Sequence, residues 1–315
     1  MVRSMRLLLH IGATKTGSSA LQQTLSQQRA ALGTQGILYS SLTEVASAHH
    51  LLVAALHPNA WRLHGNDLPD DRGTYFSEMA AAMLAEARAR RCHTLIVSSE
   101  YCWSTFDKRF YETFAAGFPG CTFEIVAFVR RPDHWAVSSY LQAVKGGEDR
   151  DFGPWVEELT ANPRSRFYFH EVIRTWHDRL EAARSHVLVY EKDVVQNVFR
   201  AFCEATSLEG VDVAVTPGRA NPSPNANGLG LLLAVNRSDL SAEEKQRRRS
   251  EIMREPKNRG SGAGAAIADA TLRRHLLQLS IASNQRILRD FLPARKGPLF
   301  TEPWPALPKI APVPG

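Results

Sequence analysis

The sequence is poor in cysteine and has no long hydrophobic run. Its 315 residues include 4 cysteines, and none of these stands in the C-x-x-C spacing of metal or redox sites. So few thiols in a chain of this length indicate a reducing compartment. No stretch approaches the roughly 20 apolar residues of a membrane helix, and the first apolar run is too short for a secretory signal. We therefore expect a cytoplasmic protein without a membrane span.

Internal repeats and strong compositional bias are also missing. Hydrophobic residues make up 44% and charged residues 22% of the chain, which excludes wholesale disorder and collagen-like sequence. The net charge of +6 is a mild basic excess. The densest basic run, Arg247-Arg248-Arg249, alternates with glutamates, which predicts a solvated helix face and argues against a nucleic-acid interface.

Short apolar runs alternate with longer segments of helical periodicity. This alternation predicts an α/β fold with a parallel sheet of about five strands and helices on both faces. The predicted strands cover residues 6–11, 36–39, 93–98, 123–129 and 186–190. The predicted helices begin at Ser18 or Ser19 and after Pro132, and cover 77–90, 168–183, 194–205 and 269–291.

No linker is clean enough to divide the chain. We therefore predict a single domain over residues 1–300, with an α-helical C-terminal part over about 194–292. Residues 216–227 are rich in proline and asparagine and predict a loop, and 260–264 predict a glycine-rich hinge. Repeated prolines predict an irregular tail over 301–315.

The loop after the first predicted strand is bounded by Gly12 and Gly17 and runs directly into a helix. Backbone N–H groups converge at such a junction, and the helix dipole favours an anion. The glycine spacing fits a Walker A loop, but Ser18 stands where the NTPase lysine belongs. The lysine of this loop, Lys15, lies inside it instead. The loop therefore predicts a phosphate-type ligand held differently from that of an NTPase.

The run Lys15-Thr16-Gly17-Ser18-Ser19 resembles the 5′-phosphosulfate loop of sulfotransferases, which use 3′-phosphoadenosine 5′-phosphosulfate (PAPS). The second half of that family's signature is a strand-end arginine, a proline two residues later and a serine eight residues after the arginine. Arg130, Pro132 and Ser138 match it. More weakly, the layout is similar to bacterial sulfotransferases with a Ser-Ser-Glu at a strand end (98–100) and late Trp and Tyr-Glu positions (176 and 190–191).

The resemblance implies a P-loop-like, three-layer sulfotransferase fold and a role for each matching residue. Lys15 would stabilise charge on the oxygen that bridges sulfate and phosphate. Thr16, Gly17, Ser18 and Ser19 would hold the 5′-phosphate. Arg130 and Ser138 would hold the 3′-phosphate, for which a guanidinium fork is well suited. The reaction would need no metal and would release adenosine 3′,5′-bisphosphate (PAP).

The base that takes the acceptor proton is less clearly marked. Glu100, at the end of the Ser-Ser-Glu run, is the first candidate. His49 and His50, which begin an apolar helical stretch, are the rivals.

The acceptor is not specified by any motif. The resemblance favours a hydroxyl on a carbohydrate or glycolipid. Aromatic side chains could stack on sugar rings or belong to the core; they are Trp61, Trp103, Trp135 and Trp155. The C-terminal Gly-x-x-Gly-x-x-Lys of cytosolic family members is absent, and the segment 259–264 either replaces it on a phosphate or forms a surface loop.

Two other function classes remain open. One is a Mg²⁺-dependent nucleotide kinase or NTPase of related fold, which the position of Lys15 and the Arg130–Ser138 pair disfavour. The other is a non-catalytic relative that binds the nucleotide without turnover.

Overall fold

The structure is a computed structural model that describes residues 4–64, 66–191, 193–208, 223–260 and 262–306. The chain divides into two compact units. The first comprises Met1–Arg130, Arg164–Arg219 and Arg286–Gly297, and the second Arg131–Pro163, Ala220–Gln285 and Pro298–Gly315. The single domain expected over 1–300 stays a prediction.

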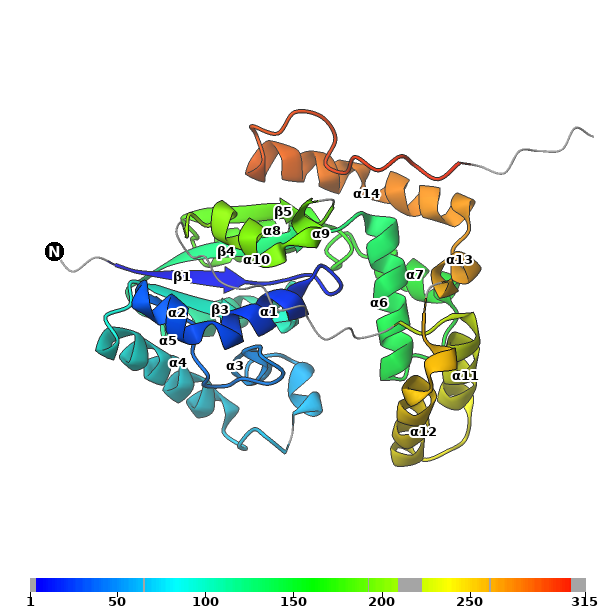
Figure 1. Ribbon diagram of the computed structural model, residues 1–315, viewed down its shortest axis with the longest axis horizontal. Helices are drawn as coiled ribbons and strands as arrows, with labels where there is room; N and C mark the ends of the chain where they lie inside the picture. The colour runs from blue at the N-terminus through cyan, green and yellow to red at the C-terminus, as the bar shows by residue number, and fades with distance from the viewer. Residues whose placement is uncertain (1–3, 65, 192, 209–222, 261, 307–315) are drawn as a thin grey trace, which may run out of the picture. The chain divides into compact units, whose positions relative to one another are not determined.

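The first unit is built on a five-stranded parallel sheet with strand order β2-β3-β1-β4-β5. The strands are β1 (Met5–His10), β2 (Ile37–Leu38), β3 (Thr94–Ser98), β4 (Cys121–Val129) and β5 (Arg184–Val189). Leu7, Leu8 and Leu9 in the central strand are fully buried, because helices cover both faces of the sheet (Figure 1). The predicted α/β class and parallel sheet are confirmed.

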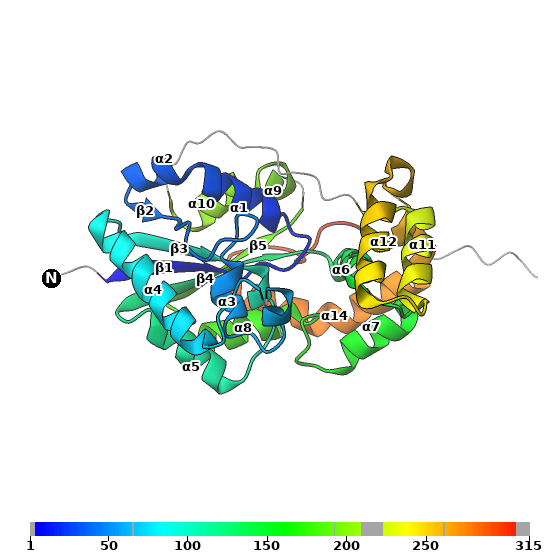
Figure 2. The same cartoon turned by 90° about the horizontal axis from the view of Figure 1, so that it is seen from below.

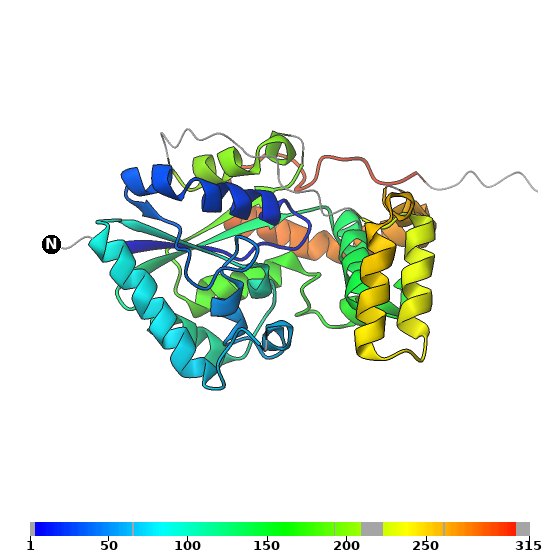
Figure 3. The same ribbon diagram turned by 60° about the horizontal axis from the view of Figure 1, so that its bottom comes forward.

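Two helical layers sandwich this sheet, as Figures 2 and 3 show. One layer holds α1 (Ser18–Gln27), α2 (Arg29–Thr34), α9 (Asp193–Gln196) and α10 (Val198–Ala205). The other holds α3 (His50–Ala54), α4 (Arg72–Ala89), α5 (Lys108–Gly117) and α8 (Phe169–Arg179). The short helices η1 (Ala60–Leu63) and η2 (Glu100–Cys102) complete the unit. Leu21 and Leu25 of α1 meet Phe199 and Phe202 of α10 in one core cluster with Leu8.

The second unit has only helices among its described residues. They are α6 (Pro132–Gly146), α7 (Phe152–Ala161), α11 (Ala226–Arg237), α12 (Ala242–Arg254), η3 (Pro256–Asn258), α13 (Ala263–Ile267) and most of α14 (Ala270–Phe291). Buried Asn236 fastens α11 to the end of α6 by donating to the carbonyls of Val144 and Glu148 at 2.8 and 2.7 Å. The helical part predicted for 194–292 is thus shared, since α9, α10 and the last turns of α14 lie in the first unit.

Several element ends differ from the predictions. Gly17, in a left-handed conformation, precedes α1, and neither Ser18 nor Ser19 caps it with its side chain. The helix predicted over 194–205 is broken at Asn197, whose side chain caps α10. Residues 301–306 form neither helix nor strand, and 307–315 of the predicted tail lie outside the described residues, as do 216–222 of the predicted loop. In the described part of the chain, no helix is both long and apolar enough to span a bilayer.

Candidate active site

The candidate site lies at the carboxyl edge of the sheet, where open parallel sheets bind their ligands. The ends of three strands are joined there by backbone hydrogen bonds. The N–H of Ser99 donates to the carbonyl of His10 at 3.1 Å, and the N–H of Ile11 donates to that of Val126 at 3.0 Å. The loops that leave β1 and β3 therefore start side by side.

The loop after β1 wraps closely around the N-terminus of α1. A Cβ added at Gly12 would lie 2.6 Å from the Ser18 hydroxyl, and one at Gly17 would lie 2.7 Å from Val198. Gly17 also has φ +84°, and Lys15 has φ +67°. The Thr16 hydroxyl is buried and donates to the Ala13 carbonyl at 2.6 Å, so it braces the loop from within. Only glycine fits both bounding positions, which leaves a narrow cradle of backbone at the helix N-terminus.

Two residues from the separate halves of the motif meet at this loop. Arg130, directly after β4, donates from Nη1 to the carbonyl of Lys15 at 3.2 Å. Burial, and then the positive charge of Arg130, lower the pKa of Lys15. Two cations so close together favour an anion between them. Ser138 lies on α6 in the second unit, so its partnership with Arg130 stays a prediction.

A fully buried histidine lies beneath the loop. His10 Nδ1 is 2.7 Å from the Ser98 hydroxyl, and the ring packs edge-on against Phe128. Burial lowers the pKa of His10 to about 3, so the ring is neutral. Its Nε2 has no hydrogen-bond partner, and a Cβ on Gly12 would lie 2.7 Å from it. A polar atom is therefore left unsatisfied under the anion cradle, where burial without a partner is costly.

The end of β3 carries a cluster of polar side chains around Glu100. The Gln22 amide, from α1, donates to the Ser98 hydroxyl and to Glu100 Oε2, both at 3.0 Å. His50 Nε2 lies 3.6 Å from the same Glu100 oxygen, and His50 Nδ1 lies 2.9 Å from the Ser99 hydroxyl. Burial lowers the pKa of His50, and the Glu100 charge partly opposes this. The Glu100 carboxylate and the His50 imidazole thus lie next to each other, and both are groups that can accept a proton.

Aromatic rings extend this cluster outward. Tyr101 stacks on His50 with ring centroids 4.4 Å apart, and its hydroxyl is 2.8 Å from His64 Nε2. None of Gln22, Tyr101, His64 and His10 is among the predicted site residues. His10 and Gln22 flank the loop motif in the sequence, whereas no motif marks Tyr101 or His64.

The structure places the predicted rival base His49 in the core. The side chain is fully buried, Nε2 donates to the Ser40 carbonyl at 2.9 Å, and Nδ1 accepts from the Ser98 N–H at 3.1 Å. Burial lowers the pKa of His49 to about 4. Both ring nitrogens are occupied, so the geometry favours Glu100 and His50 over His49.

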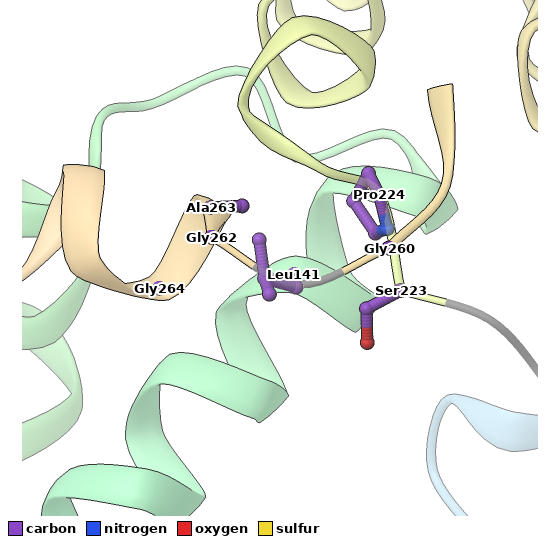
Figure 4. Close-up of a pocket in the computed structure, with 7 residues that line it drawn as sticks. All are labelled: Leu141, Ser223, Pro224, Gly260, Gly262, Ala263 and Gly264. Carbon is purple, nitrogen blue, oxygen red and sulfur yellow. The ribbon is translucent and has the colours of Figure 1, made fainter. Parts of the chain in front are cut away.

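Four residues of the glycine-rich segment lie in the second unit and line a cavity of about 370 Å³; they are Gly260, Gly262, Ala263 and Gly264. Leu141 of α6 faces this segment, and Pro224 lies across from it (Figure 4). The Arg259 guanidinium donates to the carbonyls of Met253 and Arg254, so this cation is already engaged by α12. The expectation that the segment replaces the missing lysine motif gains no support.

The tryptophans separate into two groups. Trp103, Trp135 and Trp155 are buried in the cores of their units. Trp61 on η1 is partly exposed and lines a surface cavity.

Several solved structures are similar to this chain at low sequence identity. The chain is similar in structure to sulfotransferases. A sulfotransferase from Alicyclobacillus acidocaldarius matches at 17% identity and TM-score 0.43, over 81% of this chain and 97% of the other. The sulfotransferase domain of the curacin biosynthetic pathway matches at 12% identity and TM-score 0.39, over 90% and 96%.

A third similar structure is retinol dehydratase in complex with androsterone and the inactive cofactor PAP, at 10% identity and TM-score 0.42, over 92% and 82%. No family model and no curated protein matches the sequence. Since these TM-scores lie below 0.5, the function is argued below from the chain's own residues.

Proposed function

We propose that the protein is a PAPS-dependent sulfotransferase that moves a sulfuryl group to an acceptor hydroxyl. One observation carries this proposal. Lys15 and Arg130, which the sequence separates by 115 residues, are joined by a hydrogen bond at 3.2 Å. Each belongs to one half of the phosphate-binding signature, and together they place two cations at one glycine loop.

The nucleotide side fits a doubly phosphorylated ligand. The cradle between Gly12 and Gly17 leaves no room for a Cβ, which is typical of loops whose backbone approaches a phosphate. Lys15 would stabilise the charge that develops on the leaving phosphate, and Thr16 to Ser19 would hold the 5′-phosphate with their N–H groups. Arg130 and Ser138 would hold the 3′-phosphate.

The acceptor side needs a proton acceptor. When bound, the co-substrate supplies the sulfuryl group, whose sulfur forms a bond to the acceptor oxygen as its bond to the phosphate oxygen breaks. Glu100 takes the proton that the acceptor hydroxyl loses. The Gln22 amide at 3.0 Å holds the carboxylate in place, and His50 at 3.6 Å is the second candidate base. Among the described residues, no group of three or more histidine, cysteine or acidic side chains is arranged to hold a metal.

Thermal-shift titration of the full chain with PAP and with ATP–Mg²⁺ tests the proposal. At a hundredfold excess over Kd, a ligand of the folded state stabilises it by about 2.7 kcal/mol. We expect this shift with PAP, and we expect Lys15→Ala to abolish most of it. Lys108→Ala is the matched control, because Lys108 lies exposed on α5, where it pairs with Glu112.

A shift with ATP–Mg²⁺ and none with PAP would establish a kinase or NTPase instead. PAP binding without transfer to any acceptor in a panel of sugars, phenols and amines would identify a non-catalytic relative. Either result overturns the sulfotransferase proposal.

A further inference from the structure

The first unit contains a cavity that the proposed transfer step does not use. It measures about 520 Å³ and is bordered by η1 and by the N-terminal ends of α4 and α5. Both helices lead into a strand and run antiparallel to it, so their N-termini lie toward the carboxyl edge of the sheet (Figure 3). The volume is within the range of small-molecule sites, about 300–1,000 Å³.

One wall of the cavity is aromatic. Trp61 Nε1 donates to the Pro58 carbonyl at 3.0 Å, and the Arg72 guanidinium lies 4.6 Å from the Trp61 ring centre. Phe106 stacks on Phe110 with centroids 4.0 Å apart. Flat apolar surfaces of this kind pack against the C–H faces of a ring.

The polar groups of the cavity are nearly balanced in charge. Asp71 and Asp107 accept from the N–H groups of Thr74 and Phe110 at 3.0 and 2.9 Å, so their charges cap helices α4 and α5. The side chains of Asp70 and Arg109 also line the cavity and make no hydrogen bond or ion pair with other described residues. One free carboxylate and one free guanidinium match a neutral, hydroxyl-rich ligand better than an ion.

The cavity adjoins the cluster around Glu100. His57 lines it, and the His57 ring lies 6.2 Å from the ring of Tyr101, the residue after Glu100. Tyr101 in turn stacks on His50. A ligand longer than one ring therefore has a continuous path of rings from the cavity to the candidate base.

We infer that this cavity binds a non-reacting sugar ring of an oligosaccharide acceptor, while the neighbouring ring presents its hydroxyl to Glu100. The assignment of the reacting ring rests on the proposed sulfotransferase function, and the binding in the cavity does not. Binding a remote part of the acceptor orients the reacting part, which is how enzymes use such contacts.

The test is calorimetric titration of the full chain, with and without PAP, using neutral tetrasaccharides of glucose, galactose and N-acetylglucosamine and the matching monosaccharides. We expect at least one tetrasaccharide to bind more tightly than its monosaccharide. Trp61→Ala should weaken this binding about tenfold and Asp70→Asn about fivefold, while the PAP-induced thermal shift stays unchanged. Trp61→Phe keeps a ring and should lose less.

Two matched controls lie in the second unit. Trp304 is 41% exposed with the Arg274 guanidinium 5.3 Å from its ring, and Asp239 is exposed. Trp304→Ala and Asp239→Asn should leave saccharide binding unchanged.

The inference is overturned if no neutral tetrasaccharide binds while PAP does, or if tetrasaccharide binding survives Trp61→Ala and Asp70→Asn in folded protein. Failure of the sulfotransferase proposal is a different result: a tetrasaccharide then binds in a Trp61-dependent manner, but PAP does not bind.

Discussion

The loop after β1 and the cluster after β3 begin at neighbouring strand ends, but the loop forms a site from backbone groups and the cluster forms one from side chains. The first is a backbone cradle in which Gly12 and Gly17 tolerate no side chain. The second is a set of side chains gathered on Glu100 from α1, α3 and β3. A backbone site of this kind is visible in the sequence as a local glycine spacing, whereas a side-chain site depends on residues that only the fold brings together. This difference also predicts that the two sites respond differently to mutation.

The largest effect is expected on turnover, from a change in the cluster after β3. Glu100→Gln should reduce turnover by about 10²–10⁴-fold, because the amide cannot accept the acceptor proton. Steady-state sulfation assays measure turnover, and titration with PAP measures nucleotide affinity separately. PAP affinity should not change in this variant. Glu112→Gln, an exposed glutamate on α5, is the control. Near-normal turnover in Glu100→Gln would move the base to His50.

In the loop after β1, Gly17→Ala should instead act on stability and on PAP binding. The added Cβ meets Val198 at 2.7 Å and requires φ +84° from an alanine, so we expect a loss of about 1–3 kcal/mol in stability and a weaker PAP shift. Gly33→Ala is the matched control, since its Cβ meets nothing within 4 Å. Urea unfolding and thermal shift are the measurements. Unchanged PAP binding in folded Gly17→Ala would contradict the cradle.

Acid pH should lower the stability of the folded chain through two buried histidines. Burial lowers the pKa of His10 to about 3 and that of His49 to about 4, whereas the pKa of a histidine in the unfolded chain is about 6.5. As the pH falls from 6.5 toward 4, the unfolded chain binds protons that the folded chain refuses. The free energy of unfolding therefore falls by up to about 1.4 kcal/mol per pH unit for each histidine.

Urea titrations between pH 7 and 4.5 measure this slope. His49→Gln should reduce the slope by one proton, although it also lowers stability at neutral pH. An unchanged slope in His49→Gln would refute the assignment of a buried neutral ring.

The smallest effect is expected from side chains within the cradle. Thr16→Val removes the hydroxyl that donates to Ala13 at 2.6 Å but keeps every loop N–H, so PAP binding should weaken by about 1 kcal/mol. Its counterpart Ser98→Ala removes the partner of His10 and Gln22 and should lower turnover with little change in PAP affinity. Calorimetry with PAP and turnover assays measure both. If Thr16→Val abolishes PAP binding, the hydroxyl itself holds the phosphate.

The parts predictable from the sequence are those encoded locally. The strands are predictable because Leu7 to Leu9, and the matching residues of the other strands, are buried on both faces of the sheet and therefore form continuous apolar runs in the sequence. The loop was found from glycine spacing. By contrast, the adjacent residues His49 and His50 point to the core and to Glu100, respectively, and five helical residues carry too little periodicity to tell them apart.

Arrangements that depend on distant segments could not be predicted. Gln22 reaches Ser98 and Glu100 across 76 and 78 residues. The second unit joins 131–163 with 220–285. The proline- and asparagine-rich residues 216–227 span one of its boundaries, but nothing in the sequence marks that these two stretches pack together. The two-unit division follows from which helix faces meet, and this is decided by packing.

The position of Ser98 has a consequence for how this protein can vary. Its hydroxyl is the shared neighbour of His10 beneath the loop and of the Gln22 amide that holds Glu100. The position of the Glu100 carboxylate relative to the loop after β1 therefore depends on four side chains in series, those of His10, Ser98, Gln22 and Glu100. A shorter or longer residue at any of the four would need a compensating change at the next, so we expect relatives to inherit these positions as a matched set.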